Sequence, residues 1–130
     1  MTGLDTNILV RFLTQDDAVQ CRAVLSMLMK KGATFFVPDL VLVETDWVLS
    51  SLYDWTRDEV ADAMAKLMTL HNLAFENEGR IRSALRALRH GADLSDELIV
   101  DGCRKIGCRN IATFDKGMAR RHPHFAVIPR

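Results

Sequence analysis

Short apolar runs alternate with longer amphipathic segments along this chain, and this alternation limits the folds that it can adopt. The runs are rich in β-branched and aromatic residues, which is typical of buried strands. We predict strands over residues 4–5, 34–37, 73–75, 110–115 and 125–128. Strands separated by helices favour a mostly parallel central sheet with helices on both faces. The sequence therefore predicts an α/β fold, a three-layer α/β/α sandwich, as a single domain over residues 1–130.

Capping residues mark the helices between these runs. Asp17, Asp39 and Asn77 stand where N-caps are expected, and Thr56 with Glu59 has the spacing of a capping box. The predicted helices cover residues 6–14, 18–31, 40–52, 57–71, 78–90 and about 95–106, with one more before the last strand.

One of these helices, over residues 40–52, carries an acidic residue within an apolar pattern. Val41, Glu44 and Val48 share one face of it, together with Leu52. We therefore expect Glu44 to point inward, where a carboxylate needs a partner, a metal ion or an opening to water.

Composition limits the class of protein. Hydrophobic residues make up 48% of the chain and charged residues 26%, which fits a folded globular domain rather than a disordered one. No apolar stretch reaches the roughly 18 residues of a membrane span, and no secretory signal is visible. The formal net charge of zero is unlike that of a general nucleic-acid coat protein. Cys21, Cys103 and Cys108 are an odd, sparse set, so we expect reduced thiols in a cytoplasmic protein.

Four acidic residues lie where the predicted fold can bring them together. Asp5 and Asp115 end predicted strands, Asp96 lies at the start of a helix, and Glu44 lies early in another. In open parallel sheets the functional crevice lies outside the carboxyl ends of the strands. We therefore expect these carboxylates to meet at one edge of the sheet.

Carboxylates crowded in this way repel one another unless a cation neutralises them. Hard oxygen ligands suit Mg²⁺ or Mn²⁺, which substrate phosphates commonly complete. Such an ion can lower the pKa of a bound water and stabilise charge on a transferring phosphoryl group. Phosphodiester hydrolysis is the reaction class that fits best.

Four short motifs give the chain a resemblance to the PIN-domain ribonucleases, in particular to the VapC-type toxins of bacterial toxin–antitoxin pairs. The motifs read Leu-Asp-Thr-Asn at residues 4–7, Val-Glu-Thr at 43–45, Ala-Asp-Leu-Ser-Asp at 92–96 and Ala-Thr-Phe-Asp at 112–115. Each motif alone is weak, whereas the four together in this order and spacing are specific. One departure is Leu-Ser at 94–95, where the family often has Phe-Ala.

The resemblance implies an active site and its cofactor. The metal-binding and catalytic residues would be Asp5, Glu44, Asp96 and Asp115, with Asp5 and Asp96 the most direct ligands of Mg²⁺ or Mn²⁺. Thr6, Asn7 and Thr113 would support them through hydrogen bonds. Asp93 and Glu97 lie close to Asp96 in the sequence, and we favour Asp96 as the ligand and Asp93 as a cap.

The resemblance also implies a function and partners. The chain would be a metal-dependent endoribonuclease with an RNA substrate, the toxin of a type II pair, bound by a cognate antitoxin and forming a homodimer. Four carboxylates can hold one ion or two. The alternative is an RNA- or protein-binding module of the same fold without hydrolytic activity. A receiver domain is disfavoured because a single acidic residue, Asp5, follows the first strand.

Overall fold

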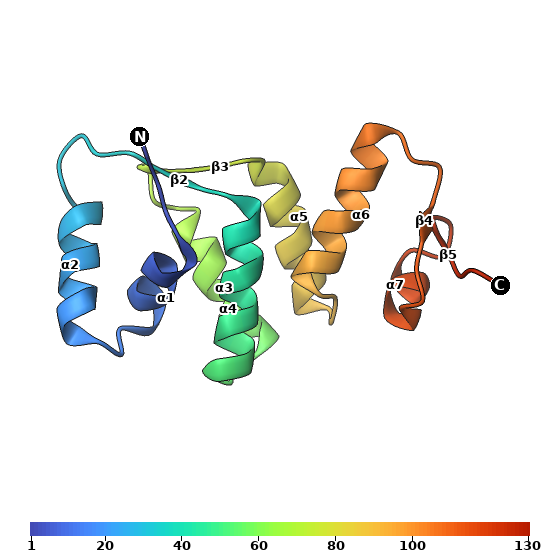
Figure 1. Ribbon diagram of the computed structural model, residues 1–130, viewed down its shortest axis with the longest axis horizontal. Coiled ribbons are helices and arrows are strands. Elements are labelled where there is room, and N and C mark those ends of the chain that lie inside the picture. The colour runs from blue at the N-terminus through green and yellow to red at the C-terminus, as the bar shows by residue number, and fades with distance from the viewer. The chain divides into compact units, whose positions relative to one another are not determined.

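A computed structural model describes residues 1–130 of the chain. These residues form two compact units, Met1–Glu78 (unit 1) and Gly79–Arg130 (unit 2). Both units combine helices with parallel strands (Figure 1), so the predicted α/β class is confirmed. None of the helices has the length and apolar character that crossing a membrane would require.

The sheet of unit 1 has three parallel strands, β1 (Thr2–Gly3), β2 (Phe35–Val37) and β3 (Leu73–Phe75). β2 is the middle strand: Phe35 pairs with Thr2 on one side and with Leu73 on the other. The backbone N–H of Leu4 also donates to the carbonyl of Phe36 at 2.9 Å, so pairing continues almost to Asp5. The first predicted strand therefore exists, but it lies slightly earlier in the chain than residues 4–5.

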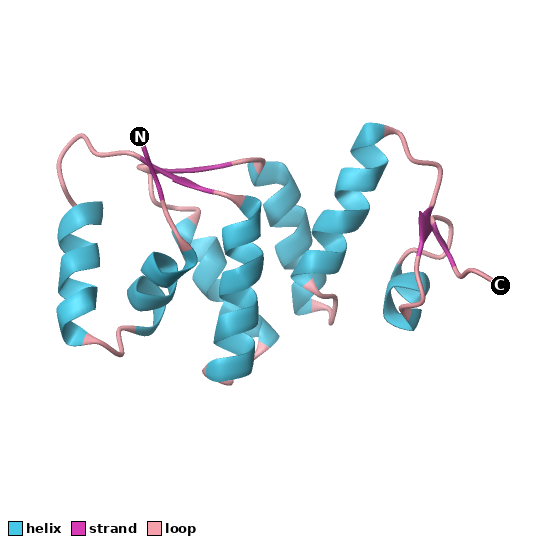
Figure 2. Cartoon of the chain, in the orientation of Figure 1, coloured by secondary structure: helices cyan, strands magenta, loops and turns pink.

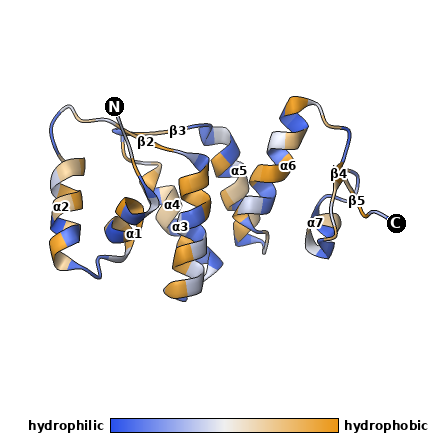
Figure 3. Cartoon of the chain, in the orientation of Figure 1, coloured by the Kyte–Doolittle hydropathy of each residue, from blue (hydrophilic) through white to orange (hydrophobic).

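Four helices flank this sheet, α1 (Thr6–Thr14), α2 (Ala18–Leu28), α3 (Asp39–Leu52) and α4 (Arg57–Leu67). The predicted N-cap Asp17 and the capping box of Thr56 with Glu59 are both confirmed. Helix α1 packs against α2 and α3. Figure 3 shows hydrophobic and hydrophilic residues mixed along these helices, as expected for elements that bury one face.

The core of unit 1 draws side chains from every one of these helices and from the sheet. Its fully buried members include Leu9, Val37, Leu42, Leu49, Val60, Met64 and Leu67. Burying a side chain of this size stabilises a fold by roughly 1.5–3 kcal/mol. This core fixes α1 and α3, the two helices that carry the acidic residues of unit 1.

Helix α3 turns a different face inward from the one predicted. Its buried residues are Leu42, Thr45 and Leu49, whereas Glu44 is exposed and Leu52 is 70% exposed. The prediction that Glu44 points inward is therefore wrong. Because α3 is apolar around most of its circumference, hydrophobic spacing alone did not distinguish its two sides.

The prediction that Asp39 caps α3 is also wrong. Pro38 occupies the N-cap position and makes no side-chain capping bond, and Asp39 is the first helical residue. Glu76, which follows β3, instead accepts the backbone N–H of Asp39 at 2.9 Å. The N-terminus of a helix has unsatisfied N–H groups, and here a carboxylate distant in the sequence satisfies one of them.

Unit 2 begins within α5 (Glu78–Arg89), one residue after the start of that helix. It also contains α6 (Leu94–Ile106), β4 (Ile111–Ala112), α7 (Lys116–Arg121) and β5 (Ala126–Val127). Strands β4 and β5 form a separate parallel pair (Figure 2), and the ladder extends to the N–H of Thr113, which donates to the carbonyl of Val127. A small core of Val100, Met118 and Phe125, with Cys103 and Ile111 against it, joins α6, α7 and this ladder.

The predicted starts and ends of elements in unit 2 need small corrections. Helix α6 begins at Leu94, with Asp93 as N-cap, rather than at Ser95 or Asp96. The strands predicted over 110–115 and 125–128 shorten to two residues each. Asp96 consequently lies within the first turn of α6.

Candidate functional site

The first acidic pair belongs to unit 1, where Asp5 ends the segment that leaves β1. Asp5 has an extended backbone and is the N-cap of α1: its Oδ1 accepts the N–H of Thr6 at 2.8 Å. The Asp5 side chain is exposed, and Asn7 is exposed in the first turn of the same helix. This bond satisfies one of the N–H groups that the first turn of a helix leaves without an intrahelical partner.

Thr6 connects Asp5 to Glu44. Its hydroxyl donates to Glu44 Oε2 at 2.9 Å, across 38 positions of sequence. Thr6 itself is buried. Through its backbone N–H and its hydroxyl, Thr6 therefore contacts two of the acidic residues that the sequence analysis proposed as metal ligands.

The second acidic pair belongs to unit 2. Asp115 is the N-cap of α7, and its Oδ1 accepts the N–H of Met118 at 3.0 Å. The hydroxyl of Thr113 accepts the N–H of Asp115 at 2.9 Å, so Thr113 fixes the turn that follows β4. Asp96 lies in the first turn of α6.

The environment of Asp96 disfavours its negative charge. Its pKa is raised, first by burial and then by the nearby carboxylates of Asp93 and Asp115, while Arg121 acts in the opposite direction. Asp96 Oδ2 is buried and has no hydrogen-bond partner. An unpartnered buried carboxylate oxygen is costly, so it is a group that a cation would satisfy.

The four acidic residues thus form two pairs, each within one unit: Thr6 links Asp5 with Glu44 in unit 1, and Asp115 lies near Asp96 in unit 2. Within either unit no group of three or more His, Cys, Asp or Glu side chains is arranged to hold a metal ion. The donor set of each pair consists of hard carboxylate oxygens, and this chemistry fits Mg²⁺ or Mn²⁺. The orphaned Oδ2 of Asp96 supports the same fit.

Arg121 is a residue of this region that sequence reasoning did not single out. Its guanidinium donates to the carbonyl of Gly91, which lies in the turn before α6. A Cβ atom on Gly117 would lie 3.1 Å from Arg121 Nη1 and 3.1 Å from Asp115 Oδ1, so the two groups flank the same glycine. The excess of basic residues in the second half of the chain was the available signal, but it did not distinguish Arg121 from its neighbours.

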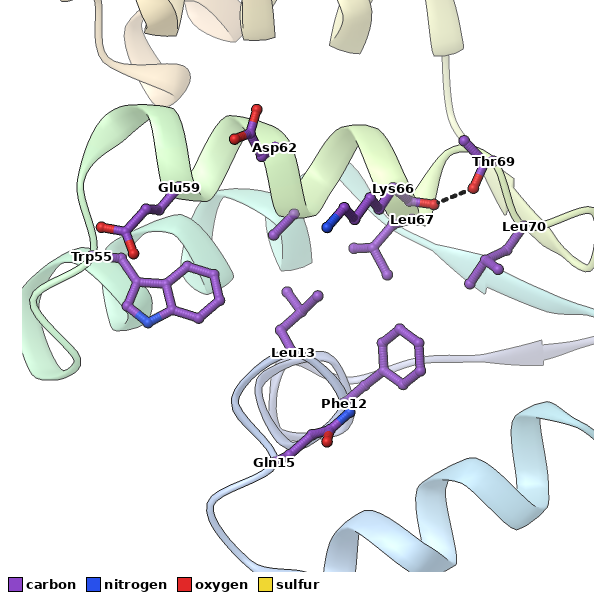
Figure 4. Close-up of a pocket in the computed structure, with 11 residues that line it drawn as sticks. Phe12, Leu13, Gln15, Trp55, Glu59, Asp62, Lys66, Leu67, Thr69 and Leu70 are labelled. Atoms are coloured by element: carbon purple, nitrogen blue, oxygen red, sulfur yellow. Dashed lines mark hydrogen bonds between the residues drawn. The ribbon is translucent and has the colours of Figure 1, made fainter.

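A groove of about 650 Å³ opens elsewhere on unit 1, between the end of α1 and α4. Figure 4 shows Phe12 and Leu13 extending from α1 toward Leu67 and Lys66 of α4, with Trp55 at one end of the groove. Acidic and polar groups line its rim: Gln15, Glu59, Asp62 and Thr69. The groove is amphipathic and contains none of the four acidic residues above.

Comparison with known proteins gives a match over most of the chain. The family model of the PIN domain matches residues 4–122, a range that includes all four acidic residues. A relative named VapC ribonuclease, from Aquifex aeolicus (strain VF5), is 27% identical over 120 residues, which cover 89% of this chain and 88% of that protein.

Proposed function

This chain belongs to the PIN-domain family, and from that premise we propose that it is a metal-dependent endoribonuclease that hydrolyses RNA phosphodiester bonds. The observation that carries the proposal is the buried Oδ2 of Asp96, which has no hydrogen-bond partner and adjoins a second carboxylate, Asp115. A similarity to the VapC ribonuclease at 27% identity supports the same reaction class.

We assign the metal ligands to both acidic pairs, Asp5 with Glu44 and Asp96 with Asp115. Mg²⁺ or Mn²⁺ would supply Lewis-acid stabilisation of charge on the phosphate oxygens. The chain's own residues hold the carboxylates in place: Thr6 orients Asp5 and Glu44, and Thr113 fixes the turn that presents Asp115. Asn7, exposed beside Asp5, is available to hydrogen-bond water or substrate.

We further propose that the protein is the toxin of a type II pair and that a cognate antitoxin binds it. The groove between α1 and α4 suits an amphipathic partner segment, because Phe12, Leu13 and Trp55 offer apolar contacts beside the charged Glu59 and Lys66. We propose a homodimer in the cytoplasm, because its three cysteines are free thiols rather than a disulfide framework. Leu13→Arg should abolish co-purification with a co-expressed antitoxin while leaving cleavage of RNA unchanged.

The decisive experiment measures RNA cleavage by the purified protein with Mg²⁺, Mn²⁺ or a chelator. Cleavage should require the ion and should fall at least about 100-fold in Asp96→Asn. Asp54→Asn is the matched control, because Asp54 is exposed and has a positive φ of 59°, a conformation that asparagine adopts readily.

Two results would count against this proposal. Cleavage that persists at full rate in chelator excludes the metal-dependent mechanism. A folded protein that binds RNA but cleaves none under any of these conditions favours the alternative, a binding module without hydrolytic activity.

A further inference from the structure

Helix α6 ends in a Schellman motif whose two contact positions are both cysteines. Gly107 has a left-handed backbone, with φ 96°, and its N–H donates to the carbonyl of Arg104 at 3.1 Å. The N–H of Cys108 donates to the carbonyl of Cys103 at 3.0 Å. These two bonds define the motif, in which the side chains at the first and sixth positions commonly touch.

The thiols of Cys103 and Cys108 are neighbours in this motif. The side chains lie close enough for Cys108 to raise the pKa of Cys103, and both cysteines are free thiols. A disulfide requires Cα atoms closer than about 7 Å with converging side chains. The backbone bond between these two residues holds the turn in the closed form that a disulfide needs.

We propose that Cys103 and Cys108 are a redox-modification site, which closes to an intrachain disulfide when the protein meets a disulfide oxidant such as oxidised glutathione. This site is independent of the proposed nuclease function. Its reactant is a small disulfide, and its product is a cross-link over the end of α6.

The two thiols have different exposure, which sets the order of the reaction. Cys108 is exposed, whereas Cys103 is partly buried against the core of Val100, Met118 and Phe125. Burial, together with the neighbouring Cys108, raises the pKa of Cys103, so less of it is thiolate at neutral pH. Cys108 therefore attacks first, and Cys103 resolves the product.

The chemistry balances without a further reactant. The thiolate of Cys108 attacks one sulfur of oxidised glutathione, forming a mixed disulfide and releasing one glutathione thiolate, which takes up a proton. The thiolate of Cys103 then attacks the sulfur of Cys108 and releases the second glutathione. Two protein thiols are oxidised, and one glutathione disulfide is reduced to two thiols.

The cross-link would act on the segment that leads to Thr113 and Asp115. Cys103 packs, with Ile111 of β4, against the core of unit 2, and Cys108 begins the connection from α6 to β4. The disulfide would restrain this connection and raise the melting temperature of the oxidised protein by a few degrees.

The test uses the full chain with the buried Cys21 replaced, Cys21→Ser, so that only the pair remains. The protein is equilibrated with defined ratios of reduced and oxidised glutathione, alkylated and weighed by mass spectrometry. The main product should carry no alkyl group, and its mass should be about 2 Da lower than that of the unalkylated dithiol protein. At one ratio of reduced to oxidised glutathione, the fraction of protein with the disulfide should be at least about 10-fold higher under native conditions than in urea. The reason is that the folded turn holds the two thiols close together.

Two further variants test the role of Cys103 as the second thiol and the role of the turn geometry. Adding Cys103→Ser should stop the reaction at a mixed disulfide on Cys108, about 305 Da heavier. Adding Gly107→Ala strains the left-handed position and should lower the native oxidised fraction toward that in urea. The proposal is overturned if the native protein carries glutathione on Cys108 without closing, or if the native and urea equilibria coincide.

Discussion

The hydroxyl of Thr6 donates a 2.9 Å hydrogen bond to Glu44 Oε2, although the two residues are 38 positions apart. The backbone N–H of the same threonine donates to Asp5. A buried residue thus orients two carboxylates that the chain supplies from different helices. Groups of this kind, which touch the ligands and not the metal, commonly control metal affinity.

Replacing Thr6 by valine should weaken metal binding. Thr6→Val keeps the shape of the side chain but removes the donor to Glu44, so Mn²⁺ affinity measured by calorimetry should fall about 10-fold or more. The free energy of unfolding should fall by about 1 kcal/mol because one hydrogen bond is lost. Thr6→Ser retains the hydroxyl and should bind Mn²⁺ with nearly native affinity; equal losses in both variants would show that the methyl group, not the hydrogen bond, matters.

Asp96→Asn should inactivate the protein and stabilise its fold at neutral pH. Burial and the carboxylates of Asp93 and Asp115 raise the pKa of Asp96, so the ionised group destabilises the folded state. An amide of the same shape removes that charge, and thermal unfolding in chelator should show a higher melting temperature than the native chain. A lower melting temperature would mean that the charge of Asp96 stabilises the metal-free fold.

The activity should decline on acidification at a higher pH than an ordinary aspartate would give. Because the pKa of Asp96 is raised, its carboxylate takes up a proton early as the pH falls, and the protonated group no longer binds a cation well. Arg121 lowers this pKa, so Arg121→Gln should move the acid limb of the pH–rate profile to higher pH. Arg109→Gln, which removes an exposed charge in the same unit, should leave the limb in place. If both variants shift the acid limb equally, the shift reflects the overall charge of the protein rather than the position of Arg121.

Glu76→Ala should destabilise unit 1 without touching the acidic pairs. Glu76 accepts the N–H of Asp39 and so acts as the N-terminal cap that Pro38 cannot provide. Its loss should cost about 1 kcal/mol in the free energy of unfolding measured with urea. Thr56→Ala removes the capping box of α4 and gives a reference loss of similar size. A change near zero would show that water caps α3 equally well.

Local signals in the sequence predicted most of the fold. The caps at Asp17 and Thr56 and the alternation of strands with helices depend on neighbouring residues, and the structure confirms them. The position of Asp5 directly after the first strand also followed from the sequence, whereas its link to Glu44 through Thr6 was not specified. The motif resemblance to the PIN-domain family is confirmed by the match over residues 4–122.

Features that depend on distant partners could not be predicted. Nothing near Pro38 indicates that Glu76 will cap α3, because that contact spans 37 positions. The inward face of α3 was predicted wrongly because apolar residues occur on both sides of the helix, and only packing selects Leu42, Thr45 and Leu49. The position of Arg121 beside Asp115 likewise depends on how α7 follows β4.

Three of the acidic side chains have one oxygen already engaged by a protein donor. Asp5 Oδ1 accepts from Thr6, Glu44 Oε2 from the Thr6 hydroxyl, and Asp115 Oδ1 from Met118. Each can therefore offer a cation its second oxygen in a monodentate manner. Ca²⁺ takes about six to eight oxygens and often uses both oxygens of a carboxylate, whereas Mg²⁺ requires a small octahedron of single oxygens. As the proposed metal ligands, these anchored carboxylates would favour the smaller ion, and we expect Ca²⁺ to be a poor substitute.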